Sequence, residues 1–216
     1  MIDVETRLRV ARGMGKTETQ ASVDVFETLK ARGHPDRPPP TLSDGWGGIR
    51  EAMVEVYGQV PPYRGIGRRP TKKRPGCDWQ YAQMVKQRDE QGRVIGTEFK
   101  VIYGDPEEVL AVLGASTAYV ERTHLTMRHM NRRLVRRGLC FSKEFRLHKA
   151  AAAWEDVVYN LVRPLKSLRQ EIKEQAARFE QRWRHRSPAM AAGLTDELWT
   201  IEQVLRTVPL PAVNNT

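Results

Sequence analysis

The chain has 216 residues and a formal net charge of +10 at pH 7; 40% of its residues are hydrophobic and 29% are charged. This balance is typical of a globular domain, and the apolar runs are far shorter than the roughly 20 residues of a membrane span, which excludes a membrane protein. Two cysteines outside any CxxC pair exclude a disulfide framework or a structural zinc site, and the N-terminus lacks a signal-peptide pattern. We therefore expect a cytoplasmic protein, and the excess of positive charge favours a polyanionic partner.

The first sixty residues alternate between strand and helix patterns. "MIDVETRLRV" predicts two short strands joined by a turn, and Thr17 and Gln20 form a capping signature for a helix that ends at Gly33. "TLSDGWGG" predicts a short strand ending at Asp44, followed by a helix over residues 49–58. A polar residue just past the carboxyl end of a strand lies where α/β sheets bind ligands, so Asp44 is a candidate site residue. The alternative is that Asp44 forms only an Asx-turn.

Residues 61–76, "PPYRGIGRRPTKKRPG", carry six Lys or Arg and no acid among several Pro and Gly. This composition predicts a mobile basic loop, with Arg68, Arg69, Lys72 and Lys73 as candidate DNA contacts. A solvated linker is the alternative. Beyond it, alternating residues predict a β-hairpin that turns at residues 90–92, and Asp105 and Gly114 delimit a further helix.

Residues 121–149 hold most of the excess positive charge, with nine Lys or Arg against two acids. We expect a long helix that begins at Glu121 and buries a stripe formed by Val120, Met127, Met130 and Leu134. At 100° per residue, Arg128 and Arg132 lie within about 20° of Glu121, and Arg136 within about 60°, so arginines follow the acid along one exposed edge. The candidate DNA contacts here are Arg122, Arg128, Arg132, Arg133, Arg136, Arg137 and Lys143.

Glu121 has two interpretations. A carboxylate at the head of a basic helix can hold a divalent cation against a phosphate, since hard cations take oxygen ligands. Alternatively, the acid only complements the positive end of the helix dipole. Asp44 favours the first interpretation, because two such carboxylates meet part of the need of a metal-dependent phosphoryl-transfer site.

Two further helices are expected in the C-terminal part. One starts near Ser142 and runs through Leu147, Ala151, Trp154, Val158 and Leu161, with Pro164 forcing a kink or a stop. The next carries a stripe formed by Leu168, Ile172, Phe179 and Trp183. A tail with one short helix follows.

Four segments together resemble the insertion-sequence transposases with a DDE catalytic domain of the ribonuclease H-like fold: "LSDGWGGIREAM", "STAYVERTHLTMRHMNRRLVRRGLCFSKE", "WEDVVYNLVRPLKSLR" and "RSPAMAAGLTDELWT". The resemblance implies an α/β fold, with a mixed sheet flanked by helices in residues 1–163 and a helical C-terminal extension in residues 164–216. It implies that Asp44 and Glu121 are the second and third catalytic ligands of Mg²⁺ or Mn²⁺. The implied partner is double-stranded DNA, at transposon ends and at the target, and a homo-oligomer is compatible with the family. The resemblance also implies a bacterial or archaeal protein that is associated with the nucleoid.

The chain departs from the family pattern at its start. The first catalytic Asp of the family lies on the opening strand of the fold, and "MIDVETRLRV" resembles the strand pair that follows it. Asp3 is a weak stand-in, because it fits the second strand better. We therefore expect a truncated domain with an incomplete catalytic triad, inactive alone, and with an uncovered sheet edge. His124 also stands where relatives have Asn.

Three functions stay open at this point. The first is a transposase that cleaves DNA and transfers strands at insertion-sequence ends. The second is a non-catalytic DNA-binding protein derived from a transposase, and the third is a structural RNA-binding protein. Steep salt dependence with little effect of Glu121→Gln would favour the second, and a preference for structured RNA the third.

Overall fold

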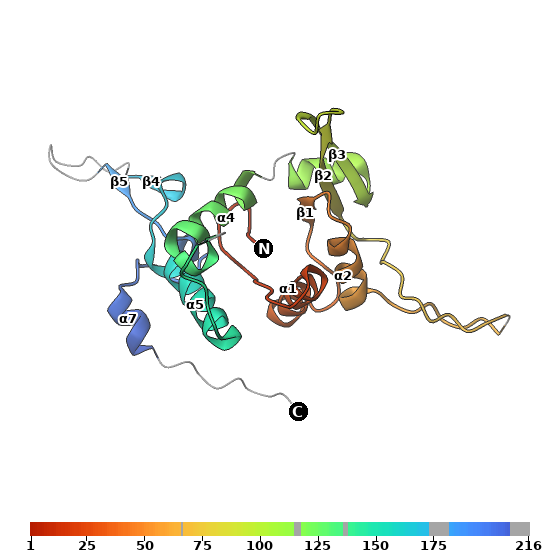
Figure 1. Cartoon of the computed structure of the whole chain (residues 1–216), viewed down its shortest axis with the longest axis horizontal. Helices are drawn as coiled ribbons and strands as arrows, with labels where there is room; N and C mark the ends of the chain where they lie inside the picture. The colour runs from red at the N-terminus through yellow and green to blue at the C-terminus, as the bar shows by residue number, and fades with distance from the viewer. Residues whose placement is uncertain (66, 115–117, 136–137, 173–181, 208–216) are drawn as a thin grey trace. The chain divides into compact units, whose positions relative to one another are not determined.

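The computed structural model describes residues 1–65, 67–114, 118–135, 138–172 and 182–207 (Figure 1). It has two compact units: Met1 with Val10–Arg122, and Ile2–Arg9 with Thr123–Thr216. Strands and helices both occur, which confirms the predicted α/β class; the ribonuclease H-like fold and the division of the chain at residue 163 stay predictions. In the described part of the chain, no helix combines the length and the apolar character that crossing a bilayer requires.

A mixed three-stranded sheet organises the first unit. Strand β1 (Thr41–Asp44) pairs in parallel with β2 (Tyr81–Arg88), and β2 pairs antiparallel with β3 (Val94–Tyr103). The predicted hairpin is confirmed, and its turn is closed by Asp89, which accepts a hydrogen bond from the Arg93 amide at 2.7 Å. Among the described residues, β1 pairs with β2 alone, so its other edge has no strand beside it.

Two helices of the first unit begin and end at the predicted caps. Thr17 accepts a hydrogen bond from the Gln20 amide at the start of α1 (Glu18–Arg32), and Gly33 ends it with a φ of 140°. Helix α2 (Gly48–Tyr57) follows β1 after a three-residue turn. Asp105 caps α3 (Pro106–Leu113) by accepting hydrogen bonds from two amides of its first turn.

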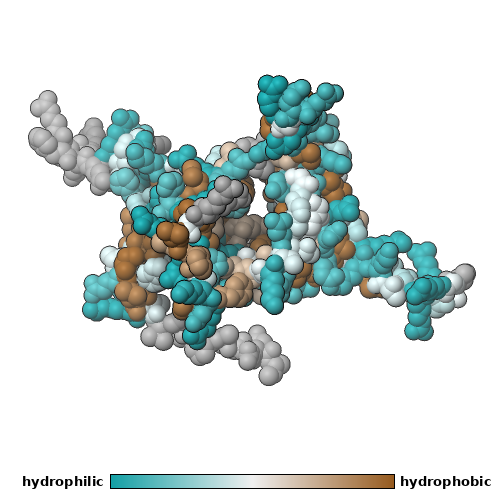
Figure 2. Space-filling view, in the orientation of Figure 1, coloured by the Kyte–Doolittle hydropathy of each residue, from teal (hydrophilic) through white to brown (hydrophobic). Residues whose placement is uncertain are grey.

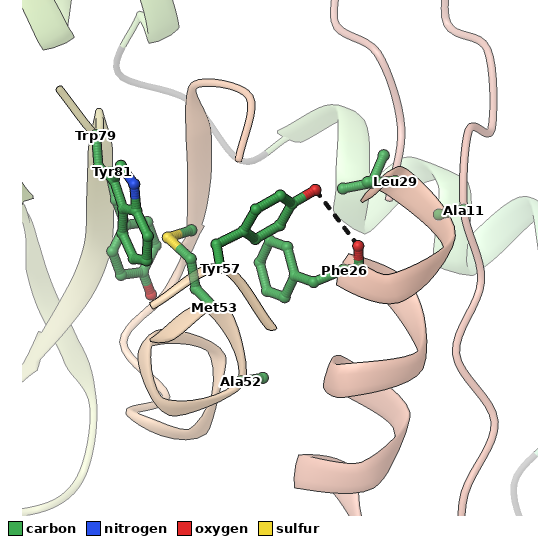
Figure 3. Packing of buried hydrophobic residues seen from close by; sticks show 8 residues of the cluster. All are labelled: Ala11, Phe26, Leu29, Ala52, Met53, Tyr57, Trp79 and Tyr81. Carbon is green, nitrogen blue, oxygen red and sulfur yellow. Dashed lines mark hydrogen bonds between the residues drawn. The ribbon is translucent and has the colours of Figure 1, made fainter. Parts of the chain in front are cut away.

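The core of the first unit joins α1 and α2 to the start of β2 (Figure 3). The Tyr57 hydroxyl donates to the Phe26 carbonyl at 3.4 Å, and the Tyr57 ring meets Phe26 and Trp79 edge-on. Each of these large side chains contributes roughly 1.5–3 kcal/mol through burial. The buried members are Ala11, Phe26, Leu29, Ala52, Met53, Tyr57, Trp79 and Tyr81. This packing fixes the strand against which β1 is paired.

Helices dominate the second unit. Helix α4 (Ala118–Met130) continues into it from the first unit, and α5 (Phe145–Val157) extends through a π-helical turn (Val158–Val162) that stops before Pro164, as predicted. The apolar residues that this helix was expected to run through are not all buried. Leu147 and Trp154 are 47% and 41% exposed, whereas Ala152 and Glu155 are buried. The helix is thus turned so that an acid faces inward.

Arg9 explains this rotation of α5. Residues 2–9 form a narrow hairpin closed by an Ile2–Arg9 bridge, and Arg9 Nη1 lies 2.7 Å from Glu155 Oε1 and 3.2 Å from Asp156 Oδ1. The guanidinium lies 3.8 Å from the centroid of the Tyr159 ring. Asn160 accepts from the Arg9 amide and donates to its carbonyl, both at 3.0 Å. The hairpin is therefore fastened to α5 by a buried ion pair.

The third long helix predicted through Leu168 and Trp183 is wrong where the structure describes it. A 3-10 turn (Lys166–Leu168) precedes β4 (Gln170–Glu171), which pairs antiparallel with β5 (Trp183–Arg184). The Arg169 guanidinium lies 4.0 Å from the Trp183 ring centroid, so Trp183 contributes to this strand pair and not to a helical stripe. Phe179 lies outside the described residues. Short helices α6 (Pro188–Ala191) and α7 (Ile201–Arg206) follow.

Candidate functional site

Asp44 is the last residue of β1, and its side chain is exposed. Its Oδ1 accepts a hydrogen bond from the Trp46 amide at 3.3 Å, which is an Asx-turn. Behind the turn, Gly48 begins α2 in a space closed by the Trp46 indole, where an added Cβ would lie 2.2 Å from a ring carbon. The predicted Asx-turn is thus present. It engages one carboxylate oxygen, and the other has no hydrogen-bond partner among the described residues.

Strand β2 supports this turn from below. The Gln83 side-chain amide donates to the Trp46 carbonyl at 3.3 Å and to the Tyr81 hydroxyl at 2.8 Å. Ser43 Oγ lies 2.9 Å from the same hydroxyl. Burial raises the pKa of Tyr81 above its ordinary value of 10, and these two hydrogen bonds partly oppose the rise. The buried network therefore fixes the end of β1, where Asp44 stands.

Glu121 lies in the first turn of α4, within the first unit. Its Oε1 is 3.1 Å from Nζ of Lys86 on β2, and the two side chains are 61% and 51% exposed. An exposed pair of this kind contributes at most about 1 kcal/mol to stability. Its main effect is therefore on the position of the Glu121 carboxylate. It ties the start of α4 to the sheet.

The strand register relates Asp44 to this ion pair. Asp44 is aligned with Met84, and Lys86 follows Met84 by two residues without an irregularity between them. Side chains two residues apart leave the same face of a sheet, so Asp44, Met84 and Lys86 share one face. With strands about 4.8 Å apart and a rise of about 3.3 Å per residue, the Cα atoms of Asp44 and Lys86 are about 8 Å apart. Glu121 is thus held against the face of the sheet on which Asp44 lies.

The candidate ligands are of the chemical type that a divalent cation prefers, but there are too few of them for a site with two ions. Exposed carboxylates are the donors that Mg²⁺ and Mn²⁺ prefer. In the described ranges, however, no three His, Cys, Asp or Glu side chains come together as a metal-binding group. Asp44 and Glu121 supply two carboxylates, whereas a paired-ion site normally needs a further carboxylate that bridges both ions.

Asp3, the weak stand-in for the first catalytic Asp, is engaged in a turn. It lies in the second unit, and its carboxylate accepts hydrogen bonds from the amide and the hydroxyl of Thr6, the former at 2.8 Å. The side chain therefore closes the turn of the N-terminal hairpin, as its position before the "VETR" turn indicated.

The predicted row of arginines on one long helix is wrong in its second half. Helix α4 ends at Met130, because Asn131 leaves the helical conformation and its side chain caps a separate 3-10 turn (Arg132–Leu134) by accepting from the Arg133 amide. Arg122 and Arg128 are exposed on α4, and Arg132, Arg133 and Lys143 are exposed beyond it. Arg136 and Arg137 lie outside the described residues. The stripe of Val120, Met127, Met130 and Leu134 is half-buried, and Thr123 on the same side is buried.

The predicted basic contacts of residues 61–76 are all exposed. These are Arg68, Arg69, Lys72 and Lys73, and Lys73 Nζ lies 2.9 Å from Glu55 Oε1 on α2. Lys86 was missed from the sequence. The sequence showed only that Lys86 is a cation at an outward position of a predicted strand. The fold reveals that this strand is paired with the one that ends at Asp44.

Comparison of the chain with family models, curated proteins and solved structures gave no significant match.

Proposed function

We propose that the chain is a DDE-type transposase domain for DNA transposition, with Asp44 and Glu121 as two of its carboxylate ligands for Mg²⁺ or Mn²⁺. In this proposal it serves metal-dependent DNA cleavage and strand transfer at insertion-sequence ends. The observation that supports it most is the Lys86–Glu121 pair, which holds one candidate ligand against the sheet face that carries the other.

Each side chain has a distinct part in this proposal. Asp44 presents a carboxylate from a turn that is fixed by Trp46 and Gln83. Glu121 presents a second carboxylate, and Lys86, which is paired with it, would compete with a divalent ion for this carboxylate. A bound divalent ion would polarise the scissile phosphate and activate the attacking oxygen. Exposed Arg122 and Arg128, on the same helix as Glu121, would contact the phosphates of the DNA.

We expect the domain to be inactive alone because two carboxylates are too few for a site with two metal ions. The clamp on the attacking and leaving oxygens needs a bridging acid, and the described residues offer none beside Asp44 and Glu121. A third carboxylate would have to come from a further segment or another chain. The open edge of β1, next to Asp44, is where an added strand would bring it closest.

A non-catalytic DNA-binding protein derived from a transposase is the second candidate. The observation that favours it is that Glu121 already has a cationic partner in Lys86, so the acid does not require a metal. This candidate predicts that Asp44→Asn and Glu121→Gln leave DNA affinity unchanged with and without Mn²⁺. The transposase proposal predicts that Mn²⁺ raises DNA affinity only when both acids are present.

The test measures Mn²⁺ binding by electron paramagnetic resonance for the unaltered protein, Asp44→Asn and Glu121→Gln. Glu90→Gln is the matched control, since Glu90 is an exposed acid in the hairpin turn. We expect each site variant to weaken binding at least tenfold and the control to bind like the unaltered protein. Equal binding by all four proteins would refute the metal site. A second assay adds Mg²⁺ or Mn²⁺ and DNA carrying element ends, with and without an upstream strand that supplies an Asp; absence of cleavage in both would refute the activity.

A further inference from the structure

Residues 59–76, which we name the basic arm, leave the first unit between α2 and β2 as two legs that run side by side (Figure 1). The base of the arm is closed by an antiparallel bridge: the Gln59 amide donates to the Arg74 carbonyl at 3.1 Å, and the Arg74 amide donates back at 2.9 Å. Lys73 adds an ion pair to Glu55 on α2 at 2.9 Å. The arm is thus anchored to the fold at its base.

The legs are also joined near the end of the arm. The Tyr63 hydroxyl donates to the Gly67 carbonyl at 3.2 Å, and the Arg69 guanidinium lies 5.4 Å from the centroid of the Tyr63 ring. Gly65 and Gly67 have φ values of 84° and 77°, which allow the chain to reverse direction there. Two levels of contact therefore give the legs a defined arrangement where the sequence predicted only a mobile loop.

The charge of the arm is of one sign. It holds six Lys or Arg and no acid, all six side chains are exposed, and most of the arm surface in view is hydrophilic (Figure 2). In the described part of the protein, Arg64, Arg68 and Lys72 have no ion-pair partner. Four prolines restrict the legs, so less conformational entropy is lost when the arm is held against a ligand. These features fit a polyanion with closely spaced charges.

We propose that the basic arm binds the phosphate backbone of duplex DNA, independently of base sequence and of divalent metal, as an attachment separate from Asp44 and Glu121. Gln59, the one amide side chain of the described arm, lies at its base, and the exposed cations of the legs suit phosphate oxygens. Single-stranded nucleic acid is held largely by stacking on aromatic rings, and the one aromatic ring of the arm, Tyr63, is engaged by Arg69. Backbone contact with a duplex therefore fits the arm best.

The test neutralises the cations that have no structural partner. The arm variant Arg64→Gln, Arg68→Gln, Lys72→Gln leaves the Gln59–Arg74 bridge, the Tyr63 contacts and the Lys73–Glu55 pair in place. The matched control is Lys16→Gln, Lys100→Gln, Lys166→Gln, which removes the same charge from exposed positions elsewhere. Binding to duplexes of two unrelated sequences is measured in EDTA by fluorescence anisotropy over a series of salt concentrations.

Each phosphate contact contributes about 0.9 to the slope of log K against log salt concentration. We expect the slope to fall by about 3 for the arm variant, equally on both duplexes, and by less than about 1 for the control. Equal slopes for the two triple variants would overturn the proposal. So would a loss confined to one duplex, or a loss seen with structured RNA and not with duplex DNA.

This inference rests on the proposed function for its choice of DNA as the ligand, yet the two can fail separately. EDTA removes any contribution of a metal, and the arm variant retains Asp44 and Glu121. If Mn²⁺ binding does not depend on the two acids but the arm variant still lowers the salt slope, the metal site is refuted and the arm proposal stands. An unchanged slope together with Mn²⁺ binding that depends on both acids would overturn the arm alone.

Discussion

Lys86 Nζ lies 3.1 Å from Glu121 Oε1, and this contact joins the first turn of α4 to the strand paired with β1. The two residues are 35 positions apart in the sequence. Because Lys86 leaves the same face of the sheet as Asp44, the pair gives Glu121 a place relative to Asp44 that neither residue reveals alone. The proposed site depends on this relationship.

Replacing Lys86 tests whether it restrains or supports the metal site. Lys86→Met removes a positive charge next to Glu121, which should favour a divalent ion by about 1 kcal/mol, or roughly fivefold tighter Mn²⁺ binding, at low salt. Calorimetric titration with Mn²⁺ measures it, and Lys100→Met on β3 is the control. Tighter binding by the control to the same degree, or no change in Lys86→Met, would contradict the placement of the ion beside Glu121.

The turn after Asp44 should tolerate a methyl group at one glycine and not at the next. Gly48→Ala places a Cβ 2.2 Å from the Trp46 ring, so the indole must move, and we expect a loss of about 1–3 kcal/mol in the free energy of unfolding. Gly47→Ala meets no atom within 4 Å and has a helical φ of −68°, so it should change stability by less than about 0.5 kcal/mol. Urea unfolding of both variants compares them, and equal losses would count against the packing of Trp46.

The buried Arg9–Glu155 pair should be far more important for stability than an exposed one. Both side chains are 4% exposed, so Arg9→Met leaves a buried carboxylate and should cost about 3–5 kcal/mol. Arg93→Met, which breaks the exposed pair with Asp89, should cost less than about 1 kcal/mol. Urea unfolding monitored by circular dichroism measures both. A double variant, Arg9→Met with Glu155→Met, should recover part of the loss; no recovery would argue against the charge as its cause.

Stability should fall at alkaline pH through Tyr81. Burial raises its pKa in the folded state, so above pH 10 the unfolded chain loses this proton first and unfolding becomes more favourable as the pH rises. Below pH 10 the phenol is protonated in both states and has no such effect. Tyr81→Phe should lower stability at pH 7, because Ser43 and Gln83 lose a partner, but should flatten the decline above pH 10. An unchanged decline would show that other groups cause it.

The elements of the first unit could be predicted because their signals are local. Thr17 and Gly33 delimit α1, Asp105 and Gly114 delimit α3, and the hairpin turn lies at Gly92, each through hydrogen bonds or backbone angles within a few residues. Asp44 was likewise placed at the end of its strand. Such contacts depend on neighbouring residues in the sequence, so a pattern of a few letters suffices.

Contacts between distant residues explain two of the differences from expectation, and a local contact explains a third. Arg9 and Glu155 are 146 positions apart, and their pairing turns α5 away from the face that hydrophobicity alone indicates. Trp183 fits a helical stripe by spacing but lies in a short strand beside Arg169. The end of α4 was missed because Asn131, a weak signal in a helix, prefers to cap the next turn.

The most direct test is Mn²⁺-induced broadening of backbone amide signals in nuclear magnetic resonance. If Asp44 and Glu121 hold one ion, the amides of Gly45 and Arg122 will broaden together, with one midpoint in the titration, while the amide of Gln91 beside Glu90 stays sharp. Asp44→Asn should then remove the broadening at Arg122 as well. Broadening at only one of the two positions, or at both with unrelated midpoints, would contradict a shared site.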